Sequence, residues 1–112
     1  MSPKENFISF VIPTYKGSET IYKLVKQVIL VVKEYKIEIV IINDCSPDQT
    51  HYLCKNLLNE FPNIITYIKL SKNFGEHNAV MAGLRNCEGD LTVIMDDDFQ
   101  NEPEEALKLV EY

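Results

Sequence analysis

The sequence predicts an α/β fold, in which helices cover both faces of a mostly parallel β-sheet. Short apolar runs alternate with longer segments of helical periodicity, and this strand–helix order occurs four times. The runs are apolar almost throughout, as in strands that are buried on both faces. The composition is that of a globular protein, with 46% hydrophobic and 25% charged residues, and a length of 112 residues predicts one domain at most.

The first three elements follow from the spacing of apolar residues. Residues 7–12 (FISFVI) predict a buried strand that Pro13 ends. Residues 19–35 predict an amphipathic helix, because apolar residues recur there at helical spacing. Residues 37–42 predict a second strand, since β-branched side chains fill five of its six positions.

The remaining elements depend on caps and turns as well. The sequence Ser46-Pro47-Asp48-Gln49 predicts the start of a second helix that runs to about residue 60, with Ser46 as its cap. Residues 64–70 predict a third strand, 75–87 a third helix and 88–90 a turn. A fourth strand at 91–95 and a fourth helix from 103 complete the pattern.

Polar residues follow all four predicted strands at the same end. They are 13–15 (PTY), 43–46 (NDCS), 71–75 (SKNFG) and 96–98 (DDD). Ligands of parallel α/β sheets bind beyond the carboxyl ends of the strands. The sequence therefore predicts a ligand cleft at this edge of the sheet.

The three aspartates after the fourth strand predict a metal site. In extended chain, Asp96 and Asp98 point to the same side and Asp97 to the other. Two carboxylates so close repel each other unless a cation lies between them, and oxygen ligands suit Mg²⁺ or Mn²⁺. Gln100 is placed to add a neutral oxygen. The alternative is an acidic loop that caps the next helix.

Other polar residues of the cleft carry weaker signals. Asp44 is suited to accept a hydrogen bond from a nucleobase ring N–H, or else to form a turn or cap the next helix. Lys72, near the N-terminus of the third helix, is suited to meet a phosphate, or else is simply solvated. His51 is predicted to lie at the surface, and His77 lies near the cleft without an assigned role.

Charge and cysteine content exclude some classes of function. The net charge is −6, and residues 96–112 carry all of the imbalance with seven acids against one base. This charge argues against a nucleic-acid partner. The odd number of cysteines (Cys45, Cys54 and Cys87) and the lack of an apolar N-terminal segment favour free thiols and a cytoplasmic location.

With these residues in hand, the chain resembles family 2 glycosyltransferases, which have the Rossmann-like GT-A fold. It is most similar to the branch of polyprenyl-phosphate glycosyltransferases that includes the dolichol-phosphate mannose synthase type. The matching segments, in the order and spacing of the family, are 11–15 (VIPTY), 41–48 (IINDCSPD), 70–75 (LSKNFG), 79–83 (AVMAG) and 89–100 (GDLTVIMDDDFQ).

The resemblance implies roles for individual residues. Pro13 and Tyr15 would flank the base and ribose, and Asp44 would hold the base. Asp96 and Asp98 would form the D-x-D motif that holds Mg²⁺ or Mn²⁺ on the diphosphate, with Gln100 in the metal shell. The implied nucleotide-sugar-binding set is Pro13, Tyr15, Glu19, Asp44, Lys72, Asp96 and Asp97.

Three positions depart from the family pattern. Lys16-Gly17 replaces the usual Asn-Glu, so that Glu19 is the first acid after Tyr15. Cys45 replaces the usual glycine, and Asp97 places a third charge in the middle of the D-x-D motif. No catalytic base is assigned.

The resemblance implies sugar transfer from a UDP- or GDP-linked donor to an acceptor such as polyprenyl phosphate, at the cytoplasmic face of the membrane. Uracil and guanine both present a ring N–H, so the base stays open. We expect the acceptor half of the domain to be absent and the exposed sheet to promote self-association. The alternatives are a non-catalytic fragment that binds nucleotide sugar and metal, and a receiver-type phosphoryl-transfer domain.

Overall fold

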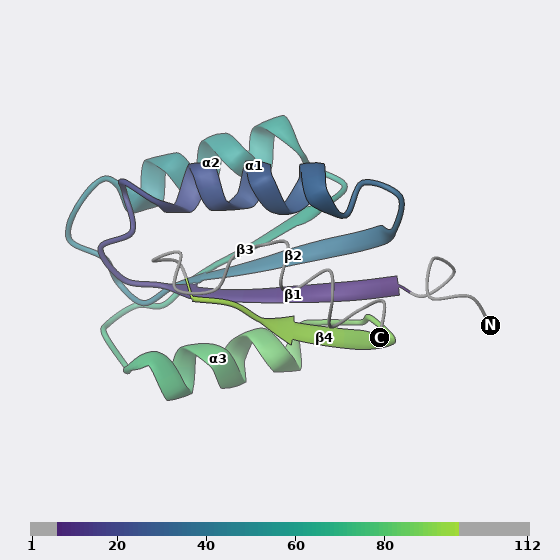
Figure 1. The fold of residues 1–112 in the computed structure, drawn as a ribbon. Helices are drawn as coiled ribbons and strands as arrows, with labels where there is room; N and C mark the ends of the chain where they lie inside the picture. Colours follow the sequence, from purple (N-terminus) through teal and green to yellow (C-terminus); the bar gives the residue numbers. More distant parts are fainter. Residues whose placement is uncertain (1–6, 97–112) are drawn as a thin grey trace.

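The computed structural model describes residues 7–96, which form the predicted α/β fold (Figure 1). Its elements in chain order are β1 (Phe7–Thr14), α1 (Ile21–Val31), β2 (Lys36–Asn43), α2 (Thr50–Glu60), β3 (Ile65–Lys69), α3 (Glu76–Arg85) and β4 (Leu91–Ile94). The strands pair in the order β3-β2-β1-β4, and all three pairings are parallel. The predicted fourth helix, from residue 103, lies outside the described residues.

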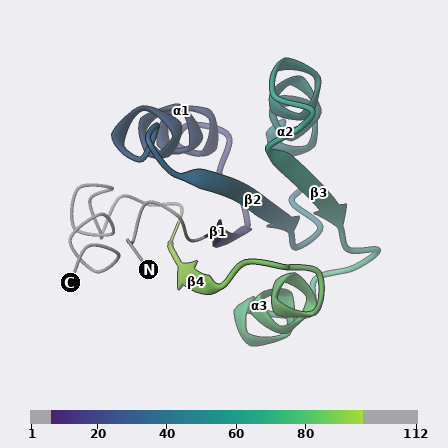
Figure 2. The ribbon, with the colours of Figure 1, turned by 90° about the vertical axis from the view of Figure 1, so that its right-hand side faces the viewer.

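Helices cover both faces of the sheet, as the sequence predicts. Helices α1 and α2 lie on one face and α3 on the other (Figure 2). The larger core cluster, which includes Phe10 and Leu24, contains buried residues of α1, α2 and the sheet. The smaller cluster beneath α3 consists of Val11, Val40, Ile42 and Ala79. Helix α3 approaches the sheet closely, since a Cβ on Gly83 would lie 2.6 Å from Val11 Cγ1.

Strand β1 continues through Pro13, where the sequence predicts its end. Val11 O accepts a hydrogen bond from Met95 N, so the odd-numbered residues of β1 direct their backbone N–H and C=O groups toward β4. Pro13 belongs to this set, but the pairing with β4 ends at Val11 and Ile94. The missing N–H of Pro13 therefore falls where no β4 partner is paired, and the strand continues alongside β2.

The predicted cap of the second helix is wrong. Helix α2 begins at Thr50, and its N-cap residue Gln49 makes no side-chain capping bond. The Ser46 hydroxyl instead accepts a hydrogen bond from Lys16 N, in the loop after β1 (3.0 Å). Asp48 Oδ1 accepts one from Thr50 N (3.1 Å), which forms a turn before the helix.

Strand β4 forms one edge of the described sheet and is the most exposed strand. Leu91 is 38% exposed and Ile94 is 49% exposed. Self-association through this surface stays a prediction. Among residues 7–96, the helices are too short or too polar to cross a bilayer. All three cysteines are free, as expected.

Candidate functional site

A small pocket lies at the carboxyl ends of β1 and β2, where the sequence predicts the cleft. Its volume is about 140 Å³, and its lining residues are Pro13, Thr14, Tyr15, Asp44, Glu76 and Ala79. Larger hollows lie at the amino ends of β2 and β3 (about 490 Å³) and on the outer surface of α1 (about 530 Å³). Neither contains residues from the carboxyl ends of the strands, so the smaller pocket is the candidate site.

Asp44 links this pocket to the loop before α3. Its side chain is buried, with Oδ1 accepting a hydrogen bond from Phe74 N (2.8 Å) and Oδ2 one from Gly75 N (2.9 Å). Gly75 is the N-cap residue of α3 and has φ +93°, which favours glycine. Asp44 therefore holds the loop that leads into α3, and it makes no such bond to the next helix in the chain, α2. Each carboxylate oxygen can accept a second hydrogen bond, so its predicted contact with a base stays open to test.

Two residues beside the pocket adopt a left-handed backbone. Lys16 and Cys45 both have φ +57°, and each comes just after the pocket residue that follows its strand. These are the positions where this chain replaces the asparagine and glycine of the family pattern. Asparagine and glycine tolerate this conformation better than lysine and cysteine, so both replacements fall at positions where the backbone of this chain is strained.

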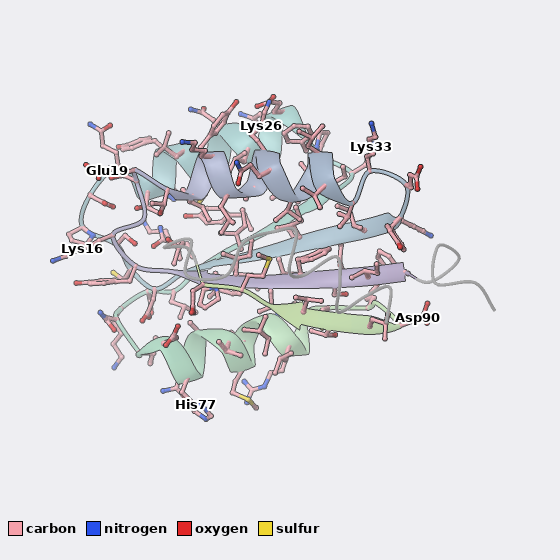
Figure 3. All side chains as sticks on the ribbon, in the orientation of Figure 1. Lys16, Glu19, Lys26, Lys33, His77 and Asp90 are labelled. Atoms are coloured by element: carbon pink, nitrogen blue, oxygen red, sulfur yellow. The ribbon has the colours of Figure 1, made fainter. Side chains whose placement is uncertain are left out.

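Two of the other predicted nucleotide-sugar ligands do not line the pocket. Tyr15 is 44% exposed and lines it, whereas Glu19 and Lys72 are exposed and do not. Figure 3 shows Glu19 and Lys16 at the end of the molecule where β1 ends. The Lys72 ammonium lies 5.1 Å from the centre of the Phe74 ring, so it stays at the same edge of the sheet.

Asp96 is the only predicted metal ligand among the described residues. It is half-buried and directly follows Met95, whose N–H donates to Val11 O of β1. Asp97, Asp98 and Gln100 lie outside the described residues. Within residues 7–96, no group of three or more acidic, histidine or cysteine side chains is placed to hold a metal ion. The D-x-D site therefore stays a prediction.

Sequence patterns did not identify two features of this edge. Glu76 lines the pocket from the first turn of α3, and its only signal was its place after Gly75. His51 is not a simple surface residue: it is half-buried, and its Nδ1 lies 2.8 Å from the Tyr67 hydroxyl. His77 is exposed on α3 (Figure 3).

Comparison with known proteins decides the family. The protein-family model described as "Glycosyl transferase family 2" matches residues 9–112. The chain belongs to this family. The match includes all of the described pocket and the D-x-D segment.

Curated relatives resemble the chain in sequence. It is 35% identical over 106 residues to the undecaprenyl-phosphate 4-deoxy-4-formamido-L-arabinose transferase of Pseudomonas fluorescens, covering 93% of this chain and 31% of the relative. It is 36% identical over 109 residues to the protein of the same name from Proteus mirabilis, covering 96% and 33%. The chain thus spans about a third of the length of these relatives.

Solved structures share the fold of this family 2 chain. A mannosyltransferase of Pyrobaculum calidifontis, in complex with GDP-Man and Mn²⁺, matches with a TM-score of 0.78 and 20% identity, over 97% of this chain and 33% of that one. Staphylococcus aureus TarS in complex with UDP-GlcNAc matches with a TM-score of 0.71 and 23% identity, over 91% and 29%. These matches confirm the predicted GT-A type of fold.

Proposed function

We propose that this chain forms the donor-binding part of a metal-dependent glycosyltransferase that transfers a sugar from a nucleoside diphosphate sugar to polyprenyl phosphate. The observation that carries the proposal is the family 2 match over residues 9–112, together with the pocket where Pro13, Tyr15 and Asp44 meet. The names of the curated relatives support undecaprenyl phosphate as the type of acceptor. A site at the cytoplasmic face of the membrane is part of the proposal.

The pocket supplies two kinds of contact for a nucleoside. The exposed ring of Tyr15 offers a face for a base or ribose, beside the rigid backbone of Pro13. The buried Asp44 carboxylate, already held by two N–H groups, offers its remaining lone pairs to a ring N–H of the base. The pocket holds only part of a nucleotide sugar, so the diphosphate and sugar extend toward β4 and Asp96.

The chemistry of the predicted metal ligands fits a hard divalent cation. Asp96, with Asp98 and Gln100 further along the chain, offers only oxygen donors, which Mg²⁺ and Mn²⁺ prefer. When bound, such an ion neutralises the charge that develops on the diphosphate leaving group. The Mn²⁺ complex of the mannosyltransferase supports the same assignment.

A polyprenyl phosphate acceptor agrees with the lack of an assigned catalytic base. This acceptor is already an anion, so it needs little help from a base to attack the anomeric carbon. A sugar hydroxyl would need a base, and none is assigned in this sequence. We expect the 112-residue chain to bind donor without transferring sugar, since it spans about a third of its relatives.

Titration calorimetry with UDP and GDP, with Mn²⁺ or with EDTA, tests the proposal. We expect at least one of the two nucleotides to bind with Mn²⁺ and to lose most of its affinity in EDTA or in Asp98→Ala. Absence of binding by both nucleotides would contradict the proposed donor. Metal-independent binding would contradict the metal site alone. Incubation with labelled donor and polyprenyl phosphate then distinguishes a binding fragment from an active enzyme.

A further inference from the structure

A chain of hydrogen bonds connects α2 to both loops of the pocket. His51 Nδ1 lies 2.8 Å from the Tyr67 hydroxyl, which lies 3.0 Å from Asn43 Nδ2. Asn43 Oδ1 accepts a hydrogen bond from Ser46 N (2.9 Å), and Ser46 Oγ accepts one from Lys16 N (3.0 Å). The chain thus runs from His51 on α2, through β3 and β2, to the loop after β1.

One backbone donor, Ser46 N, fixes which atom donates and which accepts in the hydrogen bonds between Ser46, Asn43 and Tyr67. Ser46 N is a backbone donor, so the atom of Asn43 that faces it must be the carbonyl oxygen Oδ1. The amide nitrogen of Asn43 therefore faces Tyr67 and donates to its oxygen. Within this network the Tyr67 hydrogen finds an acceptor when His51 Nδ1 is unprotonated and the ring hydrogen is on Nε2.

The environment of His51 favours this neutral form. Burial lowers the pKa of His51, and the nearby Lys69 and Lys55 lower it further. Burial raises the pKa of Tyr67 despite the opposing hydrogen bond from Asn43, so the hydroxyl keeps its hydrogen. The Tyr52 ring lies 5.7 Å from that of His51. A second hydrogen on His51 would leave the Tyr67 hydrogen without its acceptor.

We infer that Tyr67 and His51 are positioning residues for the donor site: they hold Asn43 in the one orientation that fixes the loops after β1 and β2. Asn43 is fully buried and directly precedes Asp44, while Lys16 directly follows Tyr15. Lys16 and the nearby Cys45 both have a left-handed backbone, which needs support from its surroundings. The link to donor binding rests on the proposed function, whereas the link to loop order does not.

Two variants remove different hydrogen bonds of this network. Tyr67→Phe deletes the hydroxyl and leaves the buried Asn43 nitrogen and His51 Nδ1 without this partner. His51→Phe removes only the acceptor Nδ1 of a half-buried residue. It replaces Tyr67→Phe as the test variant if Tyr67→Phe does not fold. His51→Asn is the matched rescue, because its amide oxygen can replace Nδ1 as an acceptor and does not titrate.

Amide hydrogen exchange of the nucleotide-free chain, followed by NMR, is the first measurement. We expect Tyr67→Phe to speed exchange at Ser46 and Lys16 at least tenfold relative to the sheet amide of Ile39, which bonds to Ile64 O. We expect His51→Phe to speed it about threefold and His51→Asn to restore it. Unchanged relative exchange in Tyr67→Phe and His51→Phe would overturn the inference.

Calorimetry with the nucleotide that binds, in Mn²⁺, is the second measurement. We expect the Kd to rise three- to tenfold in His51→Phe and to return within twofold of wild type in His51→Asn. Between pH 7.5 and 5.5, wild type should lose more affinity than His51→Asn. Titration of the nucleotide affects both proteins equally, so it cannot account for the difference between them. Equal pH profiles would overturn the role in donor binding. Lack of nucleotide binding by wild type would contradict the proposed function and leave the exchange result to decide the positioning role.

Discussion

The parallel strands begin at one side of the sheet, here called the amino edge, and end at the opposite side, the carboxyl edge. At both edges a polar side chain holds a loop that is distant in sequence. At the amino edge, Glu38 Oε2 accepts hydrogen bonds from the Ser9 hydroxyl and from Glu88 N, and Ser9 Oγ accepts one from Gly89 N (2.7 Å). At the carboxyl edge, Asp44 accepts hydrogen bonds from two backbone N–H groups of a loop thirty and thirty-one residues away. In each case a side chain on the sheet holds a distant loop.

The edges differ in what surrounds that loop. The amino edge brings backbone against backbone, since a Cβ on Gly89 would lie 2.6 Å from Ser9 N and 2.9 Å from Phe7 O. The carboxyl edge has left-handed residues, an exposed aromatic ring and a pocket. Figure 3 shows the labelled Asp90 and Lys16 at these opposite ends. The amino edge is therefore tightly packed around Gly89, whereas the carboxyl edge carries the candidate site.

The largest expected effect is on the amino edge. Gly89→Ala forces a methyl group against main-chain atoms that cannot rotate away, and we expect it to reduce the free energy of unfolding by about 3 kcal/mol. Urea denaturation followed by circular dichroism measures the change. Donor affinity of the folded fraction should stay near that of wild type.

Gly83→Ala is the matched control for this prediction. Its methyl group would meet the side chains of Ile42 and Val11, which can adjust, and alanine favours a helix over glycine by up to about 1 kcal/mol. We expect a net loss of about 1 kcal/mol or less. A larger loss in Gly83→Ala than in Gly89→Ala would contradict the view of the amino edge as the tighter contact.

The second prediction compares Asp44 at the carboxyl edge with Glu38 at the amino edge. In Asp44→Asn, the new amide group faces a backbone N–H instead of accepting from it, and we expect a loss of about 2 kcal/mol in the free energy of unfolding. Nucleoside diphosphate affinity should also fall. Glu38→Ala should lose similar stability and keep its nucleotide affinity, because Glu38 lies at the opposite edge.

Calorimetry and urea denaturation of both variants test this pair. Inorganic diphosphate is the ligand control, since it lacks a base for Asp44 to contact. If nucleotide and diphosphate weaken alike in Asp44→Asn, the role of Asp44 is to hold the loop at Phe74 and Gly75. If Glu38→Ala weakens nucleotide binding as much, the two edges are not independent.

The same contrast explains what the sequence could predict. All four strands and three helices follow from apolar periodicity together with turn and cap signals, because each of these patterns is local in the sequence. The pocket edge follows from a rule of parallel sheets, which places Pro13, Tyr15 and Asp44 together. Both kinds of inference need only the order of residues along the chain.

Loop hydrogen bonds could not be predicted in this way. Ser46 fits the pattern of a helix cap, but its hydroxyl binds Lys16, thirty residues earlier. The acceptor role of Asp44 toward the α3 loop and that of Tyr67 toward Asn43 also depend on contacts distant in sequence. A polar side chain has several possible partners, and only the fold decides among them.

A third, smaller effect concerns the backbone of the pocket loop. Cys45 has φ +57°, so Cys45→Gly should raise the free energy of unfolding by about 0.5–1 kcal/mol. Cys45→Ala is the control, because it removes the thiol and its long contact with Ser71 O but keeps the strained backbone. Thermal denaturation compares the two. A melting temperature that rises equally in both variants would show that the thiol, and not the backbone conformation, lowers the stability at this position.

The smallest expected effect is the pH dependence that Asp48 contributes at the start of α2. Burial raises the pKa of Asp48, but hydrogen bonds from the Thr50 hydroxyl and N–H and from Ser18 outweigh it, and the pKa lies below its ordinary value of 3.8. The unfolded chain then binds a proton at higher pH than the folded chain. Asp48 therefore stabilises the fold above about pH 4 and loses this contribution as the pH falls further.

Two variants separate this contribution from that of other acids. Asp48→Asn should flatten the fall of the urea midpoint between pH 5 and pH 2, and should cost less than about 1 kcal/mol at pH 7. Thr50→Val removes the hydroxyl donor and keeps the N–H, so the pKa of Asp48, measured by carboxyl ¹³C NMR, should rise toward its ordinary value. An unchanged pKa in Thr50→Val would show that the Thr50 hydroxyl bond does not hold this turn, and that the bonds from Thr50 N–H and from Ser18 place the start of α2.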